Sequence, residues 1–157
     1  MNKTTVFAAV LDRLRDDLAA RRGAAESARA EATSDQSRSE NKYDTRGLEA
    51  SYLARGHALS TAELEADLAA LGAFALPVAA PGERAELGTL VETSIAGSAD
   101  WYFLLPCGGG REVDCGGARI TVVTPASPMG GKLMGLRAGS TFPLRPGVAP
   151  GVVRNLF

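Results

Sequence analysis

The sequence predicts an α+β protein in which an N-terminal antiparallel two-helix coiled-coil hairpin precedes a small sheet domain. Glycine and proline break helices, and residues 1–71 hold three glycines and no proline, whereas residues 72–157 hold fifteen and eight. The first segment is also rich in charged residues and alanine, as long solvated helices are. The second has short apolar runs between turn residues, which is typical of strands. We expect a hairpin at 1–72, a linker at 73–83 and the sheet domain at 84–157.

Apolar residues of the first segment follow the alternating spacing of four and three that marks helices packed along one seam. Two such series, read in opposite directions, pair Leu14 with Leu64 near the base and Ala25 with Ala54 near the turn. Their residue numbers sum to nearly the same value in every pair, as an antiparallel hairpin folded about Ser39 requires. A helix of about 30 residues is about 45 Å long, so this hairpin would carry its turn far from the base.

The forward series begins at Phe7 and Leu11. Halfway along the hairpin, Arg21 falls opposite His57, and we interpret this pair as a polar layer in the seam. A shifted register fits the pattern almost as well. His57 is the single histidine of the chain, and the sequence offers it no recognisable catalytic partner.

The turn of the hairpin, at about 33–44, is polar and carries the carboxylates of Asp35, Glu40 and Asp44. One interpretation is that the aspartates cap or begin helices and that the glutamate is solvated. The other is that carboxylates held at the end of a long hairpin bind a divalent cation and orient water. Their spacing does not decide between these interpretations.

A short helix is predicted to begin after the strand at 120–124. Ser127 is a suitable N-cap, and Pro128 fits the first helical position because that position needs no backbone N–H donor. Leu133 lies on an apolar side that would pack on the sheet, and Gly139 lets the chain leave the helix.

Two stretches resemble the bacterial transcript-cleavage factors GreA and GreB. Ser39-Glu40-Asn41, followed by Tyr43, is similar to the hairpin tip of that family, and residues 124–139 are similar to the Ser-Pro signature of its C-terminal domain. The resemblance covers nearly the whole chain. It implies an FKBP-like α+β fold for the C-terminal domain, which would serve for docking. The docking residues it implies are Ser127, Pro128, Met129, Gly130, Leu133 and Gly135.

The resemblance also implies a function in transcription elongation. The partner would be bacterial RNA polymerase, with the C-terminal domain at the rim of its secondary channel and the hairpin inside. Tip carboxylates would help to retain an Mg²⁺ of the polymerase and to position the water that cleaves a backtracked transcript. The protein would be an accessory factor and not an enzyme, with no cofactor of its own and only indirect contact with nascent RNA.

The tip departs from the family pattern. Ser37 stands where the family has an acidic residue, and Arg38 replaces an apolar residue. Only Glu40 carries over directly; Asp35 and Asp44 are the candidates for a second catalytic carboxylate, and we assign Glu40 and Asp35 to the shared Mg²⁺. Arg38 would weaken cation retention by like-charge repulsion. A secondary-channel regulator or inhibitor without cleavage, and a coiled-coil adaptor without chemistry, are therefore alternative functions.

Charge and hydropathy exclude other classes. A net charge of -1 and a pI near 5.9 argue against a duplex-DNA binder, because phosphate contacts require a basic excess. No apolar run approaches the roughly 18 residues of a membrane-spanning helix, and acidic residues come too early for an export signal. We expect a cytoplasmic protein with neither membrane nor sequence-specific DNA partners.

Cys107 and Cys115 flank a glycine-rich stretch. A zinc site would need two further ligands nearby, so we expect free thiols at the ends of two strands joined by a hairpin loop at 108–111. A phosphate-binding nest is the alternative for this loop, but the Walker spacing and a following helix are missing.

Overall fold

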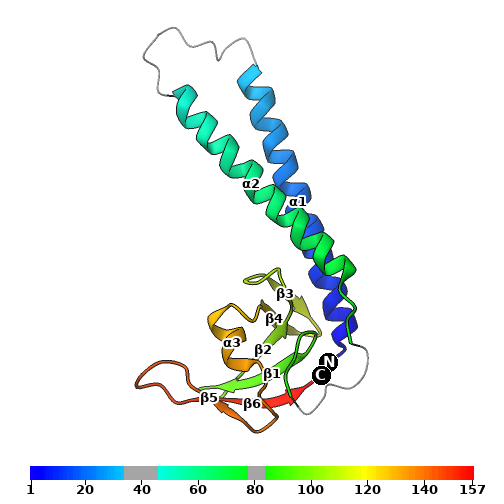
Figure 1. Ribbon diagram of the computed structural model, residues 1–157, viewed down its shortest axis with the longest axis vertical. Helices are drawn as coiled ribbons and strands as arrows, with labels where there is room; N and C mark the ends of the chain where they lie inside the picture. The colour runs from blue at the N-terminus through cyan, green and yellow to red at the C-terminus, as the bar shows by residue number, and fades with distance from the viewer. Residues whose placement is uncertain (34–45, 78–83) are drawn as a thin grey trace.

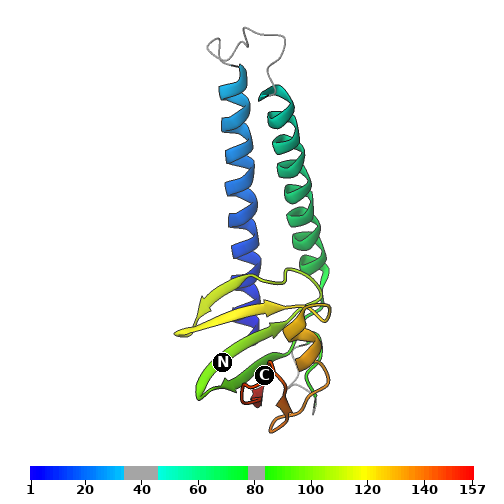
Figure 2. The same cartoon turned by 90° about the vertical axis from the view of Figure 1, so that its left-hand side faces the viewer.

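The computed structural model describes residues 1–33, 46–77 and 84–157, in which a long helical hairpin stands on a mixed β-sheet (Figure 1). Helices α1 (Lys3–Thr33) and α2 (Arg46–Ala73) run side by side in both views (Figures 1 and 2). The sheet domain comprises β1 (Leu90–Ile95), β2 (Ser98–Leu104), β3 (Glu112–Cys115), β4 (Ala118–Val123), α3 (Pro128–Leu133), β5 (Thr141–Phe142) and β6 (Gly151–Leu156). The predicted α+β fold, with the hairpin first and the sheet second, is confirmed.

Local sequence explains where α1 begins and what stabilises the helix on its solvent-exposed side. The Asn2 side-chain Oδ1 accepts a hydrogen bond from the Thr4 N–H at 2.9 Å and so caps the first turn. One turn apart on the solvent side, Arg13 and Asp17 form an ion pair at 2.9 Å. Among the helices of the described ranges, none is long and apolar enough to cross a membrane.

The six strands are ordered β3-β4-β2-β1-β6-β5, and every neighbouring pair is antiparallel except β2 with β4. After β2 the chain runs through residues 105–111 to the edge strand β3, and it returns as β4 between β3 and β2. The predicted hairpin loop at 108–111 is therefore wrong, because β2 and β3 are not neighbours. A parallel pair such as β2 and β4 requires a crossover connection, and residues 105–111 begin it.

The C-terminal segment forms β6, which lies between β1 and β5 in the sheet. Strand β6 pairs with β1, and the Phe157 N–H donates a hydrogen bond to the Leu90 carbonyl at 2.9 Å. The Phe157 ring also packs against Trp101, with ring centroids 5.6 Å apart. These contacts order the chain to its last residue.

The two faces of the sheet carry two apolar clusters, because successive side chains of a strand point to opposite faces. On β2, Phe103 belongs to the cluster shared with the hairpin, whereas Leu104 belongs to the cluster that includes Leu133 of α3. The first cluster contains Val6, Val10, Leu14, Leu18, Leu64, Leu71, Leu90, Phe103, Leu105, Val113, Ile120 and Val122. The base of the hairpin and the sheet thus share one core.

The buried side of α1 differs from the predicted seam. Val6 and Val10 are fully buried, whereas Phe7 and Leu11, with which the predicted series begins, are only partly buried. The reason is that α1 packs on the sheet as well as on α2, so its base has a wider buried surface than a two-helix seam requires. The Phe7 ring lies 6.2 Å from the Phe103 ring, between their centroids.

Farther from the sheet, the helices bury little. Ala25 and Ala54, which the predicted seam pairs, are both exposed. The stabilisation gained by burial is proportional to the apolar area removed from water, and the methyl groups of two alanines offer little such area. Arg21 and His57 are exposed as well. The helices are linked here by Arg22 and Glu65, whose side chains form an ion pair at 2.5 Å.

Candidate functional site

The predicted tip carboxylates of Glu40, Asp35 and Asp44 all lie outside the described residues. Their neighbours along the chain, Thr33 and Arg46, are at the end of the hairpin far from the sheet (Figure 2). Helix α1 has 31 residues and is therefore about 46 Å long. The described helices thus end far from the sheet.

The Ser-Pro motif folds as its sequence predicts. Ser127 is the N-cap of α3: its hydroxyl accepts a hydrogen bond from the Gly130 N–H at 3.1 Å and donates one to the Thr124 carbonyl at 2.8 Å. Pro128 occupies the first helical position. These contacts hold α3 directly beside the end of β4.

Gly130 is required by the close approach of α3 to the preceding strand. A Cβ atom at this position would lie 1.9 Å from the Thr124 carbonyl oxygen, which no side chain can tolerate. Leu133, one turn later, is fully buried in the cluster beneath the helix. Gly130 and Leu133, two of the predicted docking residues, therefore hold α3 on the sheet and are too buried to contact a partner.

The other predicted docking residues lie nearer to solvent. Pro128 is exposed, while Ser127, Met129 and Gly135 are half-buried. This part of the chain differs from the rest in its charge, because residues 115–157 contain no aspartate or glutamate. The basic residues of that segment are Arg119, Lys132, Arg137, Arg145 and Arg154. The segment that contains α3 is therefore basic in sequence, a feature that the net charge of the chain conceals.

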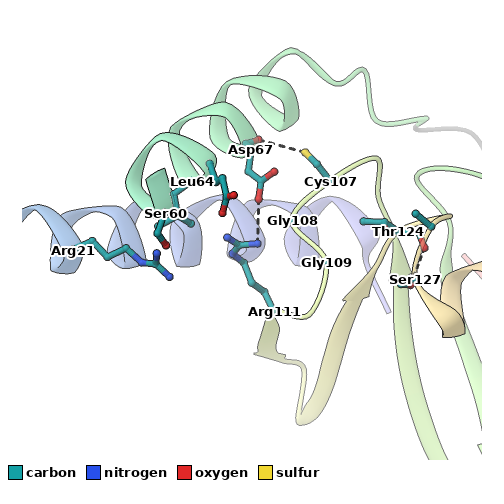
Figure 3. A pocket seen from close by; sticks show the side chains of 12 residues that line it. Arg21, Ser60, Leu64, Asp67, Cys107, Gly108, Gly109, Arg111, Thr124 and Ser127 are labelled. Carbon is teal, nitrogen blue, oxygen red and sulfur yellow. Dashed lines mark hydrogen bonds and ion pairs between the residues drawn. The ribbon is translucent and has the colours of Figure 1, made fainter. Parts of the chain in front are cut away.

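A cavity of about 580 Å³ lies between the hairpin and the loops of the sheet domain (Figure 3). It is lined from the hairpin by Arg21, Ser60, Glu63, Leu64 and Asp67 and from the loops by Cys107, Gly108, Gly109, Arg111, Thr124, Ala126 and Ser127. Its charges are balanced, with two arginines facing two acidic residues. Sequence reasoning missed this junction because its residues come from four separate segments.

Arg111 connects the two sides of this junction. Its Nη1 lies 3.2 Å from Asp67 Oδ2 on α2, and its Nε lies 3.8 Å from Asp17 Oδ2 on α1. The Arg111 side chain is 20% exposed, and its buried Nε has no hydrogen-bond partner among the described residues. One guanidinium of the sheet domain thus faces a carboxylate on each helix.

Cys107, on the loop side of the cavity, contacts Asp67 of α2. Its thiol donates a hydrogen bond to the Asp67 carbonyl over 3.6 Å (Figure 3). Burial raises the pKa of the Cys107 thiol above its ordinary value, and the negative charge of Asp67 raises this pKa further. Cys107 and Cys115 are both free thiols. In the described ranges, no group of three His, Cys, Asp or Glu residues is placed to hold a metal ion.

Comparison of the sequence with known protein families and with curated proteins finds no match. Among solved structures, the chain is similar to that of the transcription factor Gfh1, at 24% identity over 94% of this chain and 93% of that one, with a TM-score of 0.38. It is also similar to GreA factor homolog 1 (Gfh1) of Thermus thermophilus, at 22% identity over 95% of both chains and a TM-score of 0.35. The third is Gfh1 of Thermus aquaticus, at 23% identity over 95% of this chain and 94% of that one, with a TM-score of 0.38.

Proposed function

We propose that the protein is a cytoplasmic transcription elongation factor that enters the secondary channel of bacterial RNA polymerase and promotes cleavage of backtracked transcripts. The observation that carries the proposal is the hairpin. Its described residues at 19–27 and 54–59 are exposed, so this length of helix is not needed for the core. The sequence that follows its outer end is the stretch that resembles the tip of GreA and GreB.

The tip carboxylates have the chemistry that this function requires. Carboxylate oxygens are preferred ligands of Mg²⁺, and such ions often keep open positions for water and substrate. In the proposal, Glu40 and Asp35 or Asp44 donate oxygens to an Mg²⁺ that belongs to the polymerase. That ion, held by the polymerase, supplies Lewis-acid catalysis of transcript hydrolysis. The factor contributes ligands, and its own residues form no bond to RNA.

The sheet domain supports the proposal as a docking module. Helix α3 is fixed on the sheet by Ser127, Gly130 and Leu133, so that Pro128 and Met129 are presented on a rigid support. Residues 115–157 carry five basic residues and no acidic one, which would suit an acidic surface of the polymerase. If this domain docks on the polymerase, the hairpin remains free to enter the secondary channel.

The test uses purified polymerase stalled on a backtracked RNA. The wild-type factor should shorten the RNA, and Glu40→Gln should slow this shortening at least about tenfold, because the neutral amide is a weaker ligand for Mg²⁺. The matched control is Glu26→Gln, which neutralises an exposed carboxylate of α1 and should leave the rate unchanged. The variants Asp35→Asn and Asp44→Asn are then compared. The variant that slows cleavage identifies the second carboxylate.

A non-cleaving regulator is the second candidate, and Ser37 and Arg38 favour it. In that case the wild-type factor binds the polymerase and slows RNA synthesis without shortening the RNA. Restoring the acidic residue with Ser37→Asp should then confer cleavage. A chain that does not associate with polymerase at all overturns both functions and leaves the coiled-coil adaptor.

A further inference from the structure

We propose that Arg111 is a positioning residue that fixes the angle at which the hairpin leaves the sheet domain. Its guanidinium lies between the two helices and the glycine-rich loop (Figure 3). From the start of β3 it reaches Asp67 on α2 at 3.2 Å and Asp17 on α1 at 3.8 Å. A planar guanidinium spreads its positive charge over several N–H groups, so one Arg side chain can attract two carboxylates at once. Arg111 therefore ties both helices to one point of the sheet.

The backbone that carries Arg111 is itself held to the sheet. The Val122 N–H donates to the Arg111 carbonyl at 2.8 Å, and the Gly110 N–H donates to the Val122 carbonyl at 2.9 Å. Farther back in the loop, Gly108 has a φ of +78° and approaches α2 so closely that a Cβ atom there would lie 3.4 Å from Leu71 Cδ1. Arg111 thus projects from a loop that is anchored to β4 and packed on α2.

Buried apolar contacts hold the base of the hairpin. Among the residues whose burial is described, the buried apolar side chains farthest from the sheet are Leu18 on α1 and Leu64 on α2. The cavity lies beside Leu64 between the helices and the loops, with Ser60 on one side and Gly109 on the other. Among the described residues no side chain fills this space, so packing across the cavity offers little resistance to a tilt of the hairpin toward the loops. The ion pairs of Arg111 cross the junction at the inner end of that space.

The surroundings of Arg111 favour a geometric role over a stabilising one. Burying a charged group is costly unless every donor is satisfied, and the buried Arg111 Nε has no hydrogen-bond partner in the described part of the chain. The 3.8 Å separation from Asp17 is too long for a hydrogen bond. Loss of Arg111 leaves the carboxylates of Asp17 and Asp67 without this partner, but these side chains are 28% and 26% exposed, so water can solvate them. Loss of Arg111 should therefore change the hairpin angle more than the stability.

The length of the hairpin amplifies any change at its base. About 24 Å of helix separates Asp17 from Thr33, so a tilt of roughly 10° would move Thr33 by roughly 4 Å. Displacements of about 1 Å can reduce a catalytic rate about 100-fold when groups must be aligned. This consequence rests on the proposed function, whereas the hairpin angle itself is a property of the isolated protein.

The first experiment measures that angle without any partner. Residual dipolar couplings of backbone N–H groups report the orientation of α1 and α2 relative to the sheet, and a single alignment tensor should fit both parts of the wild-type protein. In Arg111→Met, the helices should need a different orientation or show reduced order, while the amide spectrum of the sheet is kept. The midpoint of thermal unfolding should shift by less than about 4 °C.

The matched control is Arg119→Met. Arg119 forms ion pairs with Glu112 and Asp114, both within the sheet domain, so its loss should leave the hairpin orientation unchanged. If Arg111→Met fails to fold, Arg111→Lys keeps the positive charge without the planar fork and should still alter the orientation. Unchanged couplings in a folded Arg111 variant, or an equal change in Arg119→Met, overturn the proposal.

The second experiment separates positioning from binding. On a backtracked polymerase, Arg111→Met should lower the cleavage rate at saturating factor about tenfold or more, while the half-saturating concentration changes less than about threefold. An altered angle combined with an unaltered cleavage rate would overturn the catalytic consequence. An altered angle in a protein that does not act on polymerase would instead contradict the proposed function and leave Arg111 as the residue that sets the angle.

Discussion

The inner and outer halves of the hairpin belong to the same two helices but are stabilised in different ways. Near the sheet, Val6, Leu14 and Leu71 are completely buried in a core that the strands share. Farther out, Ala25 and Ala54 are exposed. Isolated helices are marginal in water, and most helical stability in proteins comes from packing of an apolar face. The inner half therefore depends on tertiary packing, whereas the outer half depends on helix propensity and ion pairs.

This difference explains how the hairpin can be packed tightly on the sheet at its base and still extend far into solvent. The apolar residues are concentrated where the sheet can cover them, and the outer helices carry side chains that water can solvate. Mutations should accordingly have large effects near the sheet and small or opposite effects in the outer hairpin. The predictions below test that gradient.

The largest effect is expected for Gly130→Ala in the sheet domain. The new Cβ would lie 1.9 Å from the Thr124 carbonyl oxygen, so α3 must move away from β4 and disturb the cluster around Leu133. We expect a loss of about 4 kcal/mol in the free energy of unfolding, at the upper end for overpacking. Urea denaturation measures it. A variant as stable as wild type would show that α3 does not approach the strand so closely.

The second-largest loss of stability is expected at a buried leucine of α2, and an exposed leucine of the same helix serves for comparison. Leu64 is 2% exposed in the shared core, whereas Leu59, five positions earlier in the chain, is 60% exposed. Leu64→Ala should cost about 3 kcal/mol, and Leu59→Ala should change the free energy of unfolding by less than about 0.5 kcal/mol. The same denaturation experiment measures both. Equal costs would mean that the outer hairpin is packed as tightly as its base.

The smallest effect should have the opposite sign. Gly23 lies within α1, and in the described part of the chain no atom apart from its own neighbours and helix backbone comes within 4 Å of an added Cβ, so alanine fits there without a clash. Gly23→Ala should raise the free energy of unfolding by about 0.5–1 kcal/mol, because glycine loses more conformational entropy in a helix. Helical circular dichroism during thermal unfolding measures the change. A destabilised variant would contradict a solvated, regular helix at this position.

Much of the fold could be predicted because its signals are local. The absence of proline and scarcity of glycine before residue 72 indicated the helices, and Ser127 with Pro128 indicated the start of α3 through the backbone groups that each satisfies. The candidate site was less accessible. Family resemblance and polar turn residues directed attention to Glu40, but the role of Arg111 depends on carboxylates that lie far from it in the sequence.

What the sequence determined by itself was the division into helical and sheet segments, the start of the short helix and the uneven placement of charge, because these depend on neighbouring residues. Only the tertiary structure decided that β4 lies between β2 and β3, that Val6 and Val10 are buried, and that Arg111 faces both helices. Those features arise from contacts between distant segments. Such contacts follow from how the hairpin base and the sheet cover each other's apolar surfaces, which no local pattern specifies.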